Sequence, residues 1–197
     1  MLKVIGKCLI CISLLNLNAL AKPTLTEPEV LTDIIDDVTF YKLGTYRGFT
    51  NDGAEYQKTY FFPRYSEAYW ADSKAICKVY DFELATLESL QEANALLTMV
   101  ENHDSIKPLA VIWLWIDGIS MLPKTTTSWY WGKTGRKISF PIPWLAGFPS
   151  NTDQLCLSVG KSSLNQKFGF TNGYCSGKGY LRFICQRTEF YIPKVVL

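Results

Sequence analysis

Cysteine is the residue type in this sequence with the clearest covalent chemistry. Two of the six cysteines lie in an apolar N-terminal stretch, which leaves four for the rest of the chain: Cys77, Cys156, Cys175 and Cys185. An even number of cysteines in an exported chain predicts two disulfide bonds, and spacing alone permits three pairings. Zinc is the competing use of four cysteines, but the CxxC pairs typical of zinc sites are absent.

The single histidine, His103, argues against most catalytic and metal-binding designs. A zinc site or a pH switch built on histidine usually needs more than one. His103 falls at the end of an expected helix, where histidine more often faces solvent or the helix dipole than acts as a base. The sequence also contains no nucleophile elbow, glycine-rich phosphate loop or zinc signature. We therefore expect a protein that is not an enzyme and that carries no cofactor.

Basic side chains gather in the C-terminal half of the chain. Residues 22–117 hold 8 basic and 16 acidic side chains, a net charge of −8, and residues 118–197 hold 10 basic and 2 acidic, a net charge of +8. The whole chain carries only +2, which does not indicate a nucleic-acid binder. The split favours an anionic glycan or protein partner, unless the two halves simply neutralise each other. The basic residues available for such a partner are Lys133, Arg136, Lys137, Lys161, Lys167 and Lys178.

The first 21 residues have the composition of a secretory signal peptide. Lys3 and Lys7 precede an apolar run of about 13 residues, and Ala19–Ala21 supplies the small residues expected before cleavage. A membrane anchor is the alternative, but a span needs about 20 apolar residues and no later run is long enough. We therefore expect secretion without membrane insertion. Residues 22–38, with five acidic side chains and one basic, are expected to form an exposed acidic leader.

The order of the expected elements predicts an α+β domain. Strand-like runs at Thr39–Leu43 and Gln57–Phe62 come first. Two helices follow, one with Ser66 as N-cap and one opened by Ser89, with Glu92 completing a capping box and Leu90, Ala93, Leu97 and Val100 forming the apolar stripe. Asp117–Gly118 is expected to be a turn. Further strands are predicted at Val111–Ile116, Trp129–Trp131, Cys156–Val159, Phe168–Phe170 and Tyr180–Cys185.

Eight short motifs then occur in a family-specific order: Trp70–Cys77, Leu84–Leu87, Trp115–Gly118, Trp129–Trp131, Trp144–Asn151, Cys156–Leu157, Cys175 and Phe183–Gln186. Together they resemble the landmarks of a C-type lectin-like domain, in the style of secreted insect members. The resemblance implies two helices, antiparallel strands, a long-loop region and two disulfides, Cys77–Cys185 and Cys156–Cys175. The domain is then expected at residues 39–190, followed by a short tail at 191–197.

The resemblance also implies where a sugar-binding calcium site would lie. Its ligand positions fall on Phe148, Ser150, Gln154 and Phe170–Asn172, with Pro149 retained. None of these residues is a carboxylate, whereas calcium requires several oxygens of which some are anionic. We therefore expect ligand recognition that is independent of calcium. The sequence alone does not decide between cis and trans at Pro149.

The expected function is recognition of a glycan or a protein, for which innate recognition is one fitting role. Trp144 and Phe148 could stack on a sugar or anchor a partner, or simply cover the underside of their own loop. The alternatives are a calcium-dependent lectin with a site moved to Asn151, Asp153 and Asn172, and a structural protein without a small ligand. The expected ligand-binding residues are Trp144, Phe148, Ser150, Asn151, Gln154, Thr171, Asn172, Lys133, Arg136 and Lys137.

Overall fold

The computed structural model describes residues 40–50, 53–121, 128–150 and 153–191. The expected signal peptide at 1–21, the acidic leader at 22–38 and the tail after Tyr191 lie outside these ranges. No helix within the described ranges is both long and apolar enough to cross a membrane.

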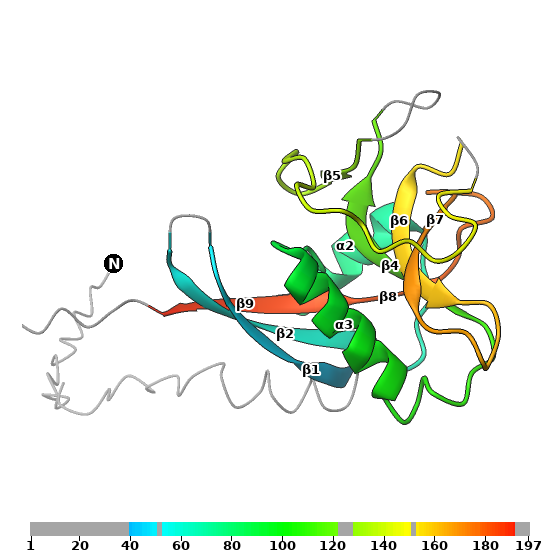
Figure 1. Ribbon diagram of the computed structural model, residues 1–197, viewed down its shortest axis with the longest axis horizontal. Helices are drawn as coiled ribbons and strands as arrows, with labels where there is room; N and C mark the ends of the chain where they lie inside the picture. The colour runs from blue at the N-terminus through cyan, green and yellow to red at the C-terminus, as the bar shows by residue number, and fades with distance from the viewer. Residues whose placement is uncertain (1–39, 51–52, 122–127, 151–152, 192–197) are drawn as a thin grey trace, which may run out of the picture.

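The first sheet forms an arm that extends away from the body of the molecule (Figure 1). Its hairpin pairs β1 (Phe40–Phe49) antiparallel with β2 (Glu55–Pro63), and β2 pairs with the last strand, β9 (Cys185–Tyr191). β3 (Glu83–Leu84) adds two residues at the other edge of β9. The order across this sheet is β1–β2–β9–β3, so that the first and the last strand of the described chain, β1 and β9, both pair with β2.

The first helix begins later than the sequence predicts. α2 (Trp70–Val79) has Tyr69 at its N-cap position without a side-chain capping bond, so the expected N-cap at Ser66 is wrong. Ala68 forms an isolated bridge with Leu181, in which the Ala68 amide donates to the Leu181 carbonyl at 2.8 Å. This pairing holds the chain extended up to Ala68, because a residue in a β-bridge cannot also lie in a helix.

The second helix, α3 (Leu90–Asn102), begins where the sequence predicts. The Ser89 hydroxyl accepts a hydrogen bond from the Glu92 amide at 3.1 Å, which is the expected N-cap. The buried face differs from the predicted stripe: Glu92 and Leu96 are buried, and Leu97 is only partly so. α3 packs against β1 and covers the sheet there (Figure 1).

The second sheet carries the long loops. Its order is β5–β4–β6–β7, with antiparallel pairing as expected, and the short β8 pairs parallel to β4. The strands span Ile112–Ile119 for β4, Tyr130–Trp131 for β5, Cys156–Lys161 for β6, Gly169–Gly173 for β7 and Arg182–Phe183 for β8.

Asp117 and Gly118 lie inside β4, so the expected turn at these residues is wrong. Asp117 is buried, and a Cβ atom at Gly118 would lie 2.5 Å from Leu157 Cδ2. Glycine is therefore required here by close packing against β6 rather than by a turn.

Both disulfides pair as the family resemblance implied. Cys77–Cys185 joins α2 to the start of β9, and Cys156–Cys175 joins the start of β6 to the loop that follows β7. With two helices, two sheets and a long-loop region, the domain is α+β.

Candidate ligand site on the long loops

Three of the expected site residues meet in one hydrogen-bonded cluster. The Ser150 amide donates to Asn172 Oδ1 at 2.8 Å, and the Ser150 hydroxyl donates to Gln154 Oε1 at 2.6 Å. Asn172 Nδ2 in turn donates to the Gln154 carbonyl at 2.8 Å. The cluster therefore ties the loop before β6 to β7, and two of its side-chain oxygens already accept hydrogen bonds.

The cluster does not have the chemistry of a calcium site. Phe148 has no ligand atom, the remaining positions supply only neutral oxygens, and the Phe148–Pro149 peptide is cis. A calcium ion is usually coordinated by six to eight oxygen atoms, several of them from carboxylates. Within the described ranges, no three His, Cys, Asp or Glu side chains are grouped so that they could hold a metal. The residues present at these positions thus do not fit the ion that the resemblance implies.

Aromatic rings flank the cluster and form a small cavity beside it. The Phe148 and Trp113 rings contact each other at a centroid distance of 5.8 Å, and both line a cavity with a volume of about 240 Å³. Trp113, Tyr174 and Lys178 line it together with Phe148 and the cluster. Sequence reasoning missed Trp113 and Tyr174, although alternation along β4 and the place of Tyr174 beside Cys175 could have indicated them.

Trp144 and Thr171 lie apart from this cavity. Trp144 packs against Trp129 at a ring distance of 5.4 Å and lines a separate cavity of about 290 Å³ with Pro149. Thr171 is 1% exposed, and its hydroxyl shares a 2.7 Å hydrogen bond with that of Ser158. Thr171 therefore does not reach a ligand on the surface. Asn151 lies outside the described residues.

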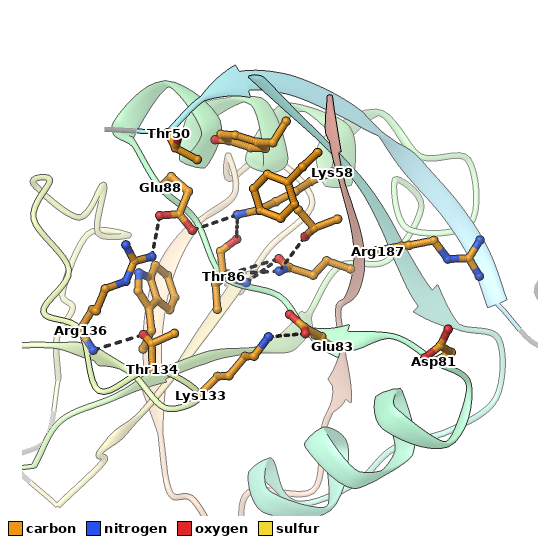
Figure 2. Close-up of a pocket in the computed structure, with 15 residues that line it drawn as sticks. Thr50, Lys58, Asp81, Glu83, Thr86, Glu88, Lys133, Thr134, Arg136 and Arg187 are labelled. Atoms are coloured by element: carbon orange, nitrogen blue, oxygen red, sulfur yellow. Dashed lines mark hydrogen bonds and ion pairs between the residues drawn. The ribbon is translucent and has the colours of Figure 1, made fainter. Parts of the chain in front are cut away.

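The expected basic residues lie on a different part of the molecule. Lys133 forms an ion pair with Glu83, and Arg136 Nη2 lies 2.8 Å from Glu88 Oε2 (Figure 2). These two basic side chains line a third cavity of about 720 Å³, which has no lining residue in common with the Phe148 cavity. Lys137 is exposed and follows Arg136, in an isolated antiparallel bridge with Tyr130. Acidic residues of the N-terminal half thus neutralise part of the basic set.

Asp117 positions the turn that carries these basic residues. Its Oδ2 atom accepts a hydrogen bond from the Lys133 amide at 2.6 Å, and its carbonyl accepts one from the Gly132 amide at 2.7 Å. Burial raises the pKa of the Asp117 carboxyl above its ordinary value, and the Lys74 ammonium 2.9 Å away opposes that rise. Asp117 is therefore a structural group of β4.

Solved structures with a similar arrangement include a C-type lectin domain. The C-type lectin domain of murine dendritic cell inhibitory receptor 2, solved in complex with an N-glycan, matches with a TM-score of 0.52 and 17% identity, over 67% of this chain and 91% of that chain. The chain has a C-type lectin-like fold.

Two further solved structures match with lower TM-scores. The mouse scavenger receptor C-type lectin carbohydrate-recognition domain has a TM-score of 0.49 and 18% identity, over 69% of this chain and 92% of that chain. SPL-1, solved as a GlcNAc complex, has a TM-score of 0.49 and 21% identity, over 66% of this chain and 87% of that chain. No protein-family model matches the sequence, and no curated protein matches it. At these identities the likeness concerns the fold alone.

Proposed function

We propose that this C-type lectin-like domain is a secreted recognition module that binds a carbohydrate or protein ligand at the Phe148 cavity without calcium. The observation that carries the proposal is the neutral cluster of Ser150, Gln154 and Asn172. Its oxygens are engaged by hydrogen bonds, and no carboxylate stands among them to hold a divalent ion. Secretion rests on the signal peptide expected at residues 1–21, and the insect-style assignment and the role in innate recognition belong to the same proposal.

The shape of the Phe148 cavity suits one ring or one anchoring side chain. Its volume of about 240 Å³ lies below the range of roughly 300–1,000 Å³ typical of small-molecule pockets. Phe148 and Trp113 offer apolar faces on which a sugar ring or an aromatic side chain can pack. Ser150 is exposed at the rim, beside Gln154, where hydroxyl or amide groups of a ligand would bind.

The charge split of the sequence predicts an anionic ligand, and in this proposal Lys178 is the basic residue that contacts it. Lys178 is exposed and lines the Phe148 cavity, whereas Lys133 and Arg136 are held in ion pairs elsewhere. Exposed charges of this kind are screened within a Debye length of about 8 Å at physiological salt. Acidic glycans are therefore expected to bind more weakly as the salt concentration rises.

A glycan array, probed in calcium and in EDTA, tests the proposal. We expect the same glycans to bind in both buffers, and Phe148→Ala to lower their affinity about tenfold or more, as for a central interface aromatic. Phe49→Ala, which removes a 70% exposed ring on the arm, is the matched control and should have no effect. Lys178→Ala should weaken acidic glycans only, and Lys133→Ala should not.

Two outcomes would overturn this assignment. Loss of binding in EDTA would favour the calcium-dependent alternative around Asn151, Asp153 and Asn172. Undiminished binding by Phe148→Ala would place the ligand elsewhere. If no glycan binds, the same variants are tested against protein ligands recovered from the fluid into which the chain is secreted, and the absence of both kinds of ligand would leave a structural protein.

A further inference from the structure

The cavity lined by Lys133 and Arg136 lies beside the first sheet and shares no lining residue with the Phe148 cavity. It has a volume of about 720 Å³. One wall is the inner face of β2 and β9, from which Tyr56, Lys58 and Phe190 line it; the other is formed by residues 83–88 and the turn at 131–136 (Figure 2). The cavity is large enough for a segment of several residues rather than for a single ring.

The floor of this cavity has its polar groups satisfied by one another. Lys58 is 3% exposed, and its ammonium lies 2.9 Å from the Thr86 carbonyl, 3.4 Å from Glu88 and 3.2 Å from Glu92. An ammonium has three protons, so these three acceptors account for all of them. Gln186 likewise accepts from the Thr86 amide and donates to the Thr86 hydroxyl. A ligand would therefore find its hydrogen bonds at the rim and along the strand edge.

The strand edge that borders the cavity is β9. β3 pairs with β9 only through Glu83 and Leu84, opposite Gln186 and Cys185. Beyond that point Thr188–Tyr191 pairs with β2 on one side and, among the described residues, with no strand on the other. Such an edge presents backbone N–H and C=O groups outward over about 13 Å, at roughly 3.3 Å per residue.

The opposite edge of the sheet, β1, is better protected against pairing than the free edge of β9. β1 carries a register shift between Lys42 and Gly44, and Lys42 and Arg47 are exposed along it. Bulges and charged side chains are the usual devices that keep an edge strand from pairing. The Thr188–Tyr191 segment has neither a bulge nor a proline, Glu189 is its single charged residue, and Phe190 is 62% exposed at the cavity mouth.

We propose that an extended peptide segment of a partner protein binds here, as an added strand along Thr188–Tyr191 with alternate side chains in the 720 Å³ cavity. An extended peptide is the ligand whose backbone groups match an unpartnered strand edge. The proposal does not depend on the Phe148 site, because the two cavities share no lining residue.

The rim determines which side chains such a peptide would carry. Two ion pairs, Lys133 with Glu83 and Arg136 with Glu88, set donors and acceptors side by side along one wall. A peptide with net charge would meet a like charge in each pair, whereas uncharged polar side chains can both donate and accept. Phe190 offers an apolar surface for a neighbouring side chain. We therefore expect Ser, Thr, Asn or Gln at the cavity-facing positions, next to an apolar residue.

The test uses a phage-displayed library of random twelve-residue peptides, selected on the full secreted chain. Peptides with the expected side chains should be enriched, and each synthetic hit is then N-methylated at one backbone position at a time. In antiparallel pairing only every second residue exchanges hydrogen bonds with the edge strand. N-methylation should therefore lower affinity about tenfold at alternate positions and hardly at all between them. Hydrogen exchange of amides in Thr188–Tyr191 should slow when the peptide binds.

Variants of the chain separate this site from the proposed function. Phe190→Ala should lower peptide affinity about tenfold, and Phe148→Ala, a matched control in the other cavity, should leave it unchanged. Failure of the library to yield binders, or N-methylation without an alternating pattern, would overturn the proposal. Neutral glycans whose binding is lost in Phe190→Ala but kept in Phe148→Ala would also overturn it and would assign the cavity to a saccharide.

Discussion

Glu92 is the buried residue that joins α3 to the first sheet through hydrogen bonds. It is fully buried in the first turn of α3, and its carboxylate accepts hydrogen bonds from the Tyr60 hydroxyl at 2.6 Å and the Tyr56 hydroxyl at 3.0 Å. The Glu88 amide donates to it at 2.6 Å, and the Lys58 ammonium lies 3.2 Å away. A buried carboxylate costs several kcal/mol in desolvation unless it is paired and hydrogen-bonded in this way.

The two tyrosines are expected to make the fold less stable at alkaline pH. Burial, followed by the charge and the hydrogen bond of Glu92, raises the pKa of Tyr56 and of Tyr60 well above the ordinary value near 10. A raised pKa stabilises the fold fully below pH 10, and that contribution is lost as the pH rises further, because the unfolded chain ionises first. We expect the free energy of unfolding to fall above pH 10 by about 1.4 kcal/mol per pH unit for each tyrosine.

Urea unfolding curves between pH 8 and pH 12 measure this slope. Tyr60→Phe removes one of the two titrating groups and should reduce the slope by about 1.4 kcal/mol per pH unit. Tyr65→Phe, which changes a 90% exposed side chain, should leave the slope as in the unchanged chain. An equal slope in Tyr60→Phe and Tyr65→Phe would contradict the role assigned to the buried hydroxyl.

At the scale of elements, the start of α3 shows how a local signal and a tertiary contact combine. The Ser89 hydroxyl caps the Glu92 amide, as the capping box predicts, but the Glu92 carboxylate accepts from the Glu88 amide one residue further out. The same carboxylate then joins the helix to Tyr56 and Tyr60 of β2. The cap thus holds the first turn of α3 next to the polar residues that form the floor of the 720 Å³ cavity.

Replacing the Ser89 hydroxyl tests whether it caps the N-terminus of α3. Ser89→Ala should lower the free energy of unfolding by about 1 kcal/mol, because one backbone donor of the first turn loses its acceptor. Ser66→Ala, at the exposed position that does not cap α2, is the matched control and should change it by less than about 0.5 kcal/mol. Chemical denaturation of both variants measures the difference, and equal effects would contradict the capping assignment.

For the whole molecule, the two disulfides are expected to contribute unequally to the free energy of unfolding. Cys77–Cys185 closes a segment with a sequence separation of 108 and fixes α2 to the last strand. Cys156–Cys175 spans a separation of 19 and lies beside the long-loop cluster. In the chain-entropy model the longer loop contributes roughly 4–5 kcal/mol and the shorter about 3 kcal/mol.

Removing each pair separately tests this difference. The double variant Cys77→Ala with Cys185→Ala should lose more unfolding free energy than Cys156→Ala with Cys175→Ala, measured in urea without a reducing agent. The second variant should also weaken ligand binding at the Phe148 cavity, since Cys175 follows Tyr174 in its lining. A larger loss of stability from the shorter loop would contradict the entropic account.

Much of the fold follows from patterns that act over a few residues. The capping box at Ser89, the apolar run that became β4 and the strand-like run at Gln57–Phe62 place these elements within a few residues of their bounds. Ser66 and Asp117–Gly118 were misassigned because a distant partner, Leu181 or Leu157, decides the local conformation.

The sequence by itself determined the α+β class and the second helix, while spacing left three disulfide pairings open and the family resemblance implied the two that the structure has. Only the tertiary structure decided which charges are free and which rings form the site. Lys133 and Arg136 meet carboxylates 50 and 48 residues away, and Phe148 meets Trp113 instead of Trp144. Spacing along the chain fixes hydrogen bonds within a turn, but such distant partners depend on where the sheets bring separate segments together.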